Sequence, residues 1–197
     1  VYNAVDPLSD QERLQIKRGI TDKVVTFLGR VTLQKGPEYF IQAAHKVLQK
    51  MDNVRFVMAG SGELLQKMIH WTSALGISDR FHYTGFLKGD DVFRMFSISD
   101  LYVMPSVSEP FGISPLEAMQ SNVPAIISYQ SGVAEILQYA FKVDFWDVDA
   151  MADAIYGILN YPSLSEMFKI HGVTEVNDMK WENSGIRVHE IYKEFVK

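Results

Sequence analysis

The chain of 197 residues carries a formal net charge of −5, is 47% hydrophobic and contains no cysteine. The acidic balance argues against a nucleic-acid partner, and the lack of cysteine excludes a disulfide framework, a thiol nucleophile and a cysteine metal site. No run of about 18 apolar residues and no signal-peptide pattern predicts a membrane span. These properties indicate one soluble domain with an ample hydrophobic core.

Short apolar runs alternate with amphipathic stretches along the chain. The apolar runs are predicted to be buried parallel strands, at residues 24–28, 54–59, 81–84, 101–104, 125–127 and 141–143. Apolar residues at helical spacing predict three helix faces between them, formed by Phe40, Ala43, Val47 and Leu48, by Leu64, Leu65, Met68 and Trp71, and by Met151, Ile155, Ile158 and Leu159. This alternation predicts an α/β fold with a doubly wound, Rossmann-like parallel sheet and ligands at the carboxyl ends of its strands.

The segment after the first predicted strand combines two glycines with two cations. Gly29 and Gly36 allow the backbone to approach a ligand closely, and Arg30 and Lys35 lie between them. Arginine offers a planar fork to phosphate oxygens and lysine a movable point charge, so the pair could clamp a diphosphate without a metal. The competing interpretation is that both are ordinary solvated surface charges beside a helix start.

The segment after the fourth predicted strand places two carboxylates around a predicted helix start. Glu109 falls in the loop, Glu117 falls in the first turn, and the helix is predicted to open near residues 112–115. Free N–H groups at a helix start favour phosphate, while carboxylates accept hydrogen bonds from hydroxyls. The combination indicates a site for a nucleotide-sugar, which carries both groups.

Structural interpretations compete with the functional ones in these loops. Ser114 and Glu117 also spell a capping box with proline at the first helical position, and Glu109 could be an exposed loop acid. Residues 60–62 could serve as a tight turn and helix cap rather than as ligand contacts. Glu135, in the segment 131–135, could be a dipole partner at a helix start or a site residue.

Several ordered motifs together resemble the retaining glycosyltransferases of the GT-B fold, of the family four or group 1 type, over nearly the whole chain. These motifs are Phe27-Leu28-Gly29-Arg30 with Lys35-Gly36, Met58-Ala59-Gly60-Ser61-Gly62, Thr84-Gly85-Phe86, Pro105-Ser106, the Glu109 to Glu117 segment, and Ser131-Gly132-Val133-Ala134-Glu135. The resemblance implies that a hexose is transferred, with retention of configuration, from a nucleotide-diphosphate sugar to a carbohydrate or another hydroxyl acceptor. No cofactor and no metal are expected.

The same resemblance implies roles for individual residues. Arg30 and Lys35 would contact the donor diphosphate and Glu109 the hydroxyls of the transferred sugar, so these three are the expected catalytic residues. Glu117 would bind the ribose hydroxyls. The remaining donor contacts are expected from the backbone or loops at Gly29, Gly85, Phe86, Leu87, Phe111, Gly112 and Ile113, with the loop 85–87 lining the nucleobase.

The resemblance also implies a domain organisation. Residues 1–197 would form one nucleotide-sugar-binding domain, with a post-linker segment at 1–22, a Rossmann-like core at 23–180 and a C-terminal helix at 181–197. This would be the C-terminal half of a cytoplasmic enzyme whose N-terminal acceptor domain is absent, so the isolated domain is expected to be inactive. Membrane association through the missing half stays open. Two alternatives are a nucleotide-sugar epimerase of GT-B fold and a non-enzymatic nucleotide-binding module.

Overall fold

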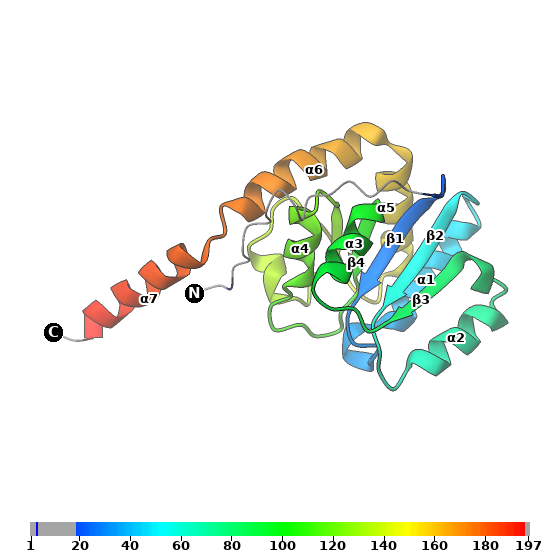
Figure 1. Cartoon of the computed structure of the whole chain (residues 1–197), viewed down its shortest axis with the longest axis horizontal. Helices are drawn as coiled ribbons and strands as arrows, with labels where there is room; N and C mark the ends of the chain where they lie inside the picture. The colour runs from blue at the N-terminus through cyan, green and yellow to red at the C-terminus, as the bar shows by residue number, and fades with distance from the viewer. Residues whose placement is uncertain (1–2, 4–18, 196–197) are drawn as a thin grey trace.

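A computed structural model describes residue 3 and residues 19–195 and shows a six-stranded parallel sheet (Figure 1). The strands are β1 (Lys23–Leu28), β2 (Val54–Ala59), β3 (Phe81–Gly85), β4 (Leu101–Met104), β5 (Ala125–Ser128) and β6 (Phe141–Val143). Their order across the sheet is β3-β2-β1-β4-β5-β6, and every pairing is parallel. The doubly wound sheet predicted from the sequence is therefore confirmed. Its order reverses between β1 and β4, the position at which such sheets bind ligands.

Helices connect the strands and cover both faces of the sheet (Figure 1). They are η1 (Leu33–Lys35), α1 (Pro37–Leu48), α2 (Leu65–Ala74), η2 (Ser78–Arg80), α3 (Asp90–Ile98), α4 (Ser114–Gln120), η3 (Gly132–Glu135), α5 (Val148–Asn160), α6 (Pro162–Asn177) and α7 (Trp181–Phe195). The three predicted helix faces fall on α1, on α2 with the residue before it, and on α5. All three pack toward the same core, which confirms the predicted periodicity.

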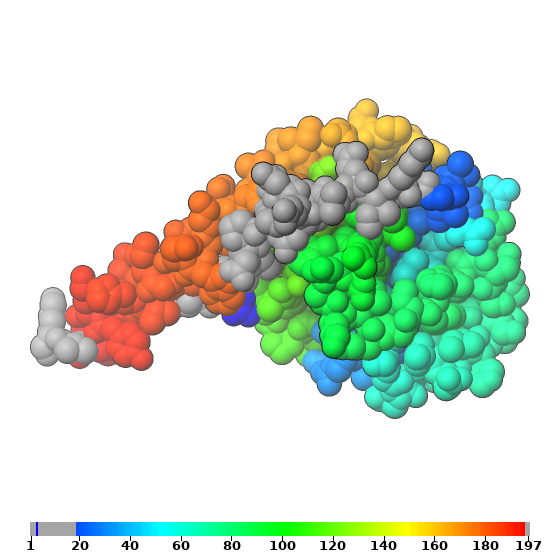
Figure 2. Space-filling view, in the orientation of Figure 1, coloured from blue at the N-terminus to red at the C-terminus, as the bar shows by residue number. Residues whose placement is uncertain are grey.

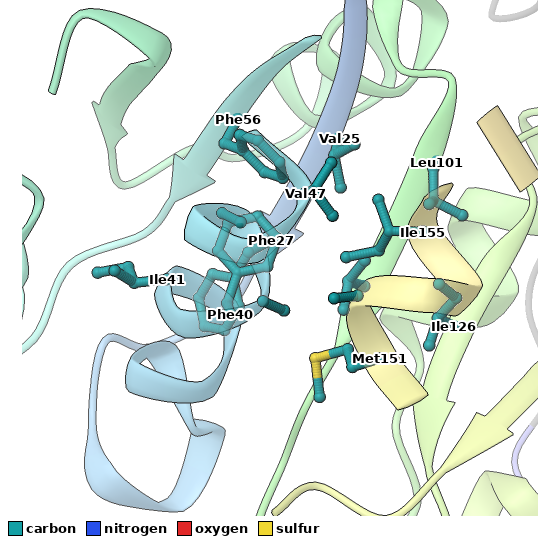
Figure 3. Packing of buried hydrophobic residues seen from close by; sticks show 14 of the residues in the cluster. Val25, Phe27, Phe40, Ile41, Val47, Phe56, Leu101, Ile126, Met151 and Ile155 are labelled. Carbon is teal, nitrogen blue, oxygen red and sulfur yellow. The ribbon is translucent and has the colours of Figure 1, made fainter. Parts of the chain in front are cut away.

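Two hydrophobic cores lie on opposite faces of the sheet because side chains alternate along each strand. The first core lies under α1, α2 and α5, where Phe27 of β1 and Phe56 of β2 each pack against Phe40 with ring centroids 5.7 Å apart (Figure 3). The second core lies under α3 and α4. Helix α6 contributes Phe168 to the first core and Val176 to the second, so it joins the two layers at one end of the sheet.

The last helix, α7, extends away from the body of the molecule (Figures 1 and 2). None of its described residues is buried, and its exposed large hydrophobic side chains are Trp181, Ile186, Val188, Tyr192 and Phe195. The helix expected at 181–197 is thus found over Trp181–Phe195, and residues 196–197 lie outside the described residues, as does most of the segment 1–22. None of the described helices has the length and apolar character needed to cross a membrane.

A close contact between two loops ties the end of β1 to the end of β4. Gly36, between η1 and α1, has a left-handed backbone with φ 62° and ψ 41°. A Cβ atom at this position would overlap the carbonyl oxygen of Pro105, which directly follows β4. The N–H of Val107 also donates to the carbonyl of Gln34 at 2.9 Å. Only glycine satisfies both the backbone conformation and the close approach.

Replacing this glycine tests how firmly the two loops are held. Gly76 is the matched control because its φ is 70° and nothing lies within 4 Å of an added Cβ. Gly76→Ala should lower the free energy of unfolding by about 1–2 kcal/mol through left-handed strain alone. Gly36→Ala should cost roughly 1–3 kcal/mol more, because the methyl group meets a backbone carbonyl. Urea unfolding measures both values, and equal midpoint shifts would show that the loops separate freely.

Candidate functional site

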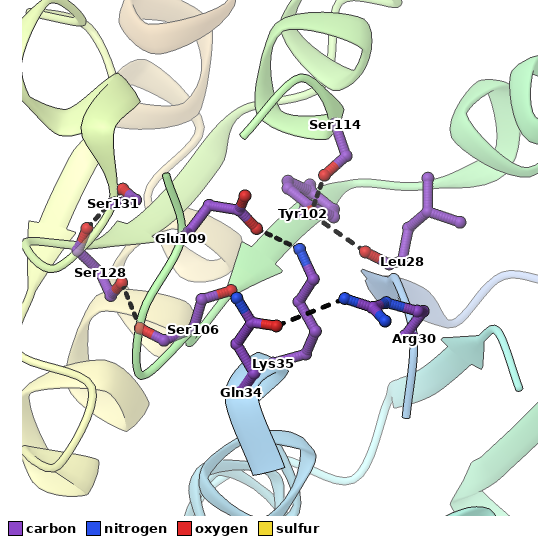
Figure 4. Close-up of polar contacts among 10 residues, drawn as sticks. All are labelled: Leu28, Arg30, Gln34, Lys35, Tyr102, Ser106, Glu109, Ser114, Ser128 and Ser131. Atoms are coloured by element: carbon purple, nitrogen blue, oxygen red, sulfur yellow. Dashed lines mark hydrogen bonds and ion pairs between the residues drawn. The ribbon is translucent and has the colours of Figure 1, made fainter. Parts of the chain in front are cut away.

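The residues singled out from the sequence lie at the carboxyl ends of β1 and β4, which are neighbours in the sheet. Arg30 and Lys35 follow β1, and Glu109 follows β4 (Figure 4). Lys35 and Glu109 are 74 positions apart in the chain, and the reversal of strand order brings them into contact. The structure therefore joins the two segments that the sequence indicated separately.

Lys35 and Glu109 form an ion pair at the centre of this edge (Figure 4). The ammonium of Lys35 donates to Oε2 of Glu109, and the two side chains are only 21% and 11% exposed. The Lys35 stem passes over Gly29, with its nearest carbon 3.7 Å from where a Cβ of that glycine would lie. The sequence indicated a phosphate contact for Lys35 and a sugar contact for Glu109, and in the structure these two side chains bind each other.

Arg30 lies on the same loop as Lys35 but is exposed. Its Nη2 donates to Oε1 of Gln34 at 3.3 Å (Figure 4). Because an exposed contact of this length is weak, the guanidinium can turn toward an arriving anion at little cost. One loop thus supplies one cation held by a carboxylate and a second that is accessible from solvent.

Backbone hydrogen bonds on both sides hold Glu109 in place. Its N–H donates to the carbonyl of Gln130 at 3.2 Å, and its carbonyl accepts from the N–H of Gly132 at 2.9 Å. A Cβ at Gly132 would overlap the carbonyl oxygen of Pro110, so this position also requires glycine. The segment after β5 therefore supports the main chain of Glu109.

The segment 131–135 forms a short helix that includes Glu135. Its 3-10 helix, η3, runs over Gly132–Glu135, so Glu135 is the last residue of the helix, and its side chain is exposed. Because η3 has only four residues, Glu135 also lies in its first turn, as the interpretation of this residue as a partner for a helix start requires, and its role as a site residue stays a prediction.

Helix α4 begins at Ser114, within the predicted region, but without the predicted capping box. Ile113 is the N-cap residue and no side chain caps the helix. Ser114 is already helical, and its hydroxyl hydrogen-bonds the hydroxyl of Tyr102 at 2.8 Å (Figure 4). The capping-box interpretation is wrong because the serine is engaged by a tertiary partner, and Pro115 accordingly occupies the second helical position.

Tyr102 is a structural contact of the site that the sequence analysis missed. It lies in the otherwise apolar strand β4, is fully buried, and its hydroxyl also donates to the carbonyl of Leu28 at 3.4 Å. Burial raises the pKa of the Tyr102 hydroxyl far above its usual value, so it stays neutral and serves as a hydrogen-bonding bridge. The sequence signal for this contact was a tyrosine within an apolar run, because a buried phenol needs a polar partner.

Glu117 lies in α4 and is half-buried. Burial raises the pKa of its carboxyl above the ordinary value of 4.5, and no described side chain or N–H group donates to that carboxylate. Just before it in the chain, the N–H groups of Gly112, Ile113 and Ser114 have no acceptor among the described residues. This end of the site therefore offers both an acceptor and several donors to a ligand.

The loop after β2 packs against the loop after β1. A Cβ at Gly60 would overlap the carbonyl of Gly29, and a Cβ at Gly62 would overlap that of Val31. Helix α2 starts only at Leu65, with Leu64 as its N-cap residue. The turn before α2 therefore lies at residues 63–64 and not at the expected residues 60–62, which are held by close packing, and the interpretation of residues 60–62 as a helix cap is wrong.

The loop after β3 presents an aromatic ring to solvent. Gly85 has φ 71°, Phe86 is 73% exposed, and Leu87 packs against the second core. The carbonyl of Gly85 accepts from the N–H of Gly60 at 2.8 Å, which fixes this loop beside the turn after β2. The expected contact of residues 85–87 with a nucleobase stays a prediction.

Within residues 3 and 19–195, no group of three or more histidine and acidic side chains is placed to hold a metal ion. Neither a metal nor a cofactor is expected from the sequence, and this stays a prediction. The charged groups described at the site are the side chains of Arg30, Lys35, Glu109 and Glu117.

Comparison with known proteins gives the family. The family model of glycosyl transferases group 1 matches residues 10–173. The chain is 30% identical over 208 residues to an uncharacterized glycosyltransferase of Methanocaldococcus jannaschii, covering 98% of this chain and 53% of that protein. It is 32% identical over 157 residues to the 2-deoxystreptamine N-acetyl-D-glucosaminyltransferase of Niallia circulans, covering 78% of this chain and 40% of that protein. The chain thus spans about half the length of these curated relatives, or less.

Solved structures share the fold at low sequence identity. HepE of Anabaena, in complex with UDP and glucose, superposes with a TM-score of 0.85 at 18% identity, covering 98% of this chain and 56% of that chain. The C-terminal domain of a group 1 family glycosyl transferase from Francisella tularensis gives a TM-score of 0.75 at 21% identity, covering 90% and 94%. These likenesses confirm the Rossmann-like fold expected for a GT-B glycosyltransferase. With its family model matched over residues 10–173, the chain belongs to the group 1 glycosyltransferases.

Proposed function

We propose that this chain is the C-terminal, donor-binding domain of a retaining GT-B glycosyltransferase. The full enzyme would move a hexose from a nucleotide-diphosphate sugar to a carbohydrate or other hydroxyl acceptor held by an N-terminal domain. The contact of Lys35 with Glu109 at the switch point of the sheet carries the proposal. It places a cation that can bind phosphate beside a carboxylate that can accept hydrogen bonds from sugar hydroxyls. A nucleotide-diphosphate sugar carries phosphate and sugar hydroxyls next to each other.

The diphosphate would be bound by the cations of the loop after β1. Lys35 supplies a point charge, Arg30 a planar fork, and Gly29 leaves room for the ligand to approach the backbone. Charge grows on the leaving nucleoside diphosphate as the sugar bond breaks, so cations already in position lower the barrier. Backbone donors in residues 111–113 would add to this stabilisation, and no metal is required.

The hydroxyl-bearing parts of the donor would be bound by the two carboxylates. Glu109 would orient the hexose, and Glu117 would accept hydrogen bonds from the ribose. The exposed ring of Phe86 offers a surface on which a base can stack, with Gly85 and Leu87 completing that loop. The hexose, the diphosphate and the base would thus be bound by the loops after β4, β1 and β3, and the ribose by α4.

The comparisons support this proposal over its alternatives. A solved structure of similar fold was determined with UDP and glucose, and the matched relatives are glycosyltransferases. The partial coverage of those relatives supports a separate acceptor domain. The family match gives no support to an epimerase or a non-enzymatic binding module. A cytoplasmic location is proposed because nucleotide-sugars are mostly used there.

Removing the Lys35 ammonium should weaken nucleotide binding. Lys35→Ala loses one charge-assisted contact of roughly 1.5–3 kcal/mol, which lowers affinity about 10- to 150-fold. Isothermal titration of this chain with UDP, GDP and ADP identifies the best nucleotide and measures the loss. Lys50→Ala is the matched control, because Lys50 pairs with Asp153 on the exposed surface. The affinity of this variant for the nucleotide should equal that of the wild-type chain. An equal effect of both substitutions would contradict the role of Lys35.

Glu117→Gln should stabilise the protein at neutral pH. Because burial raises the pKa of this carboxyl in the folded state, the folded protein binds more protons than the unfolded chain between the ordinary and the raised pKa. Stability therefore falls as pH rises through that window and stays lower above it. Chemical unfolding across pH should show a gain for Glu117→Gln that disappears below the ordinary pKa of 4.5. Glu166→Gln, on the exposed surface of α6, should show no such gain, and a loss of stability in Glu117→Gln would contradict the raised pKa of Glu117.

The same substitution should weaken recognition of the ribose. A neutral amide is a poorer acceptor for two hydroxyls than a carboxylate, so Glu117→Gln should lower affinity for UDP, or for whichever nucleotide binds best. The 2′-deoxy form of that nucleotide provides the sharper readout. The wild-type chain should prefer the ribose form, and the variant should lose most of that preference. An unchanged preference, measured by titration calorimetry, would remove Glu117 from the ribose contact.

A further inference from the structure

The Lys35–Glu109 ion pair bears on which ligands the site accepts, if the site binds a nucleotide-sugar as proposed above. Both side chains are largely shielded from solvent, so their mutual attraction is screened less than that of a surface pair. Glu109 is also fixed through its backbone, because both its N–H and its carbonyl are bonded to the loop after β5. Its carboxylate can therefore move away from an arriving anion only by rotation of the side chain.

A diphosphate that reaches Lys35 must share or replace this carboxylate. The ammonium has three N–H donors, and one of them serves Oε2 of Glu109 in the structure. Turning these donors to phosphate oxygens leaves a carboxylate beside a polyanion, and like charges at this spacing repel. A nucleotide-sugar resolves the conflict, because its sugar hydroxyls donate to the carboxylate that Lys35 has released. A nucleoside diphosphate has no such hydroxyl groups at that place.

We propose that Glu109, by holding Lys35, makes the site discriminate in favour of a nucleotide-sugar and against the nucleoside diphosphate left after transfer. Glu109 then acts as a specificity-determining residue in addition to its proposed contact with the hexose. The effect favours release of the product, because loss of the sugar leaves the carboxylate and the diphosphate facing each other. The same logic predicts weak binding of inorganic pyrophosphate.

The test measures two affinities by titration calorimetry, for a nucleoside diphosphate and for the matching nucleotide-sugar. UDP with UDP-glucose, GDP with GDP-mannose and ADP with ADP-glucose are the probes, and the pair that binds best is used. Glu109→Gln should bind the nucleoside diphosphate more tightly than the wild-type chain, on the order of 5- to 50-fold. Its affinity for the nucleotide-sugar should rise much less or fall, so the preference for the sugar form shrinks.

Two controls separate this effect from a general change of charge. Asp153→Asn removes a carboxylate from the exposed pair with Lys50 and makes the same change in net charge, so it should alter neither affinity. In a Lys35→Ala background the repulsion between the Glu109 carboxylate and the diphosphate remains while the competition for the ammonium is gone, so the difference between the gains from Glu109→Gln in the two backgrounds measures that competition, and equal gains would show that Lys35 plays no part in the discrimination. Glu109→Ala provides a second neutral variant should the glutamine variant fold poorly.

Different outcomes overturn the inference and the proposed function. If the wild-type chain binds nucleotides but neither neutral variant at position 109 gains affinity for the nucleoside diphosphate, the discrimination is absent and the donor site stands. If the wild-type chain binds none of the probes, the proposed function fails and the inference fails with it. A crystal structure with bound UDP gives an independent check, in which Lys35 should contact phosphate rather than Glu109.

Discussion

The close approach of the loop after β1 to the loop after β4 is the constraint on which the site depends. Gly36 lies against the carbonyl of Pro105, and the carbonyl of Gln34 accepts a hydrogen bond from the N–H of Val107. These backbone contacts hold the two loops against each other. The connections from β1 and β4 then lead to opposite faces, with α1 on one core and α4 on the other. The polar side chains of both loops meet at the edge between these strands, where Lys35 contacts Glu109.

The partly buried charges of the site come at some cost to the stability of the folded protein. Lys35 and Glu109 neutralise each other while shielded from water, and Glu117 keeps a half-buried carboxylate with no donor among the described residues. Partly buried carboxylates destabilise a fold unless they are paired. The stabilising free energy that offsets this cost comes from the two hydrophobic cores. The loss of stability from Glu117 and its proposed contact with ribose are two consequences of the same position.

Much of the precision of the site comes from residues that would not touch a ligand. Tyr102 joins β4 to the start of α4 through Ser114, while the loop after β5 fixes the main chain of Glu109 through Gly132. Ser128 donates to the carbonyl of Ser106 at 2.6 Å and accepts from Ser131 at 2.7 Å, which ties the loops after β4 and β5 together (Figure 4). Such a supporting layer limits the movement of Glu109, which is what allows a single carboxylate to distinguish between ligands.

The sequence by itself determined the strands, the apolar helix faces and the positions of Arg30, Lys35, Glu109 and Glu117. These follow from local periodicity and from which residue types occur after a strand, and both are visible within a few neighbouring positions. Only the tertiary structure decided that Lys35 binds Glu109 and that Ser114 binds Tyr102 instead of capping α4. Each of these depends on strand order and loop contact between residues distant in the chain, for which local sequence patterns carry no signal.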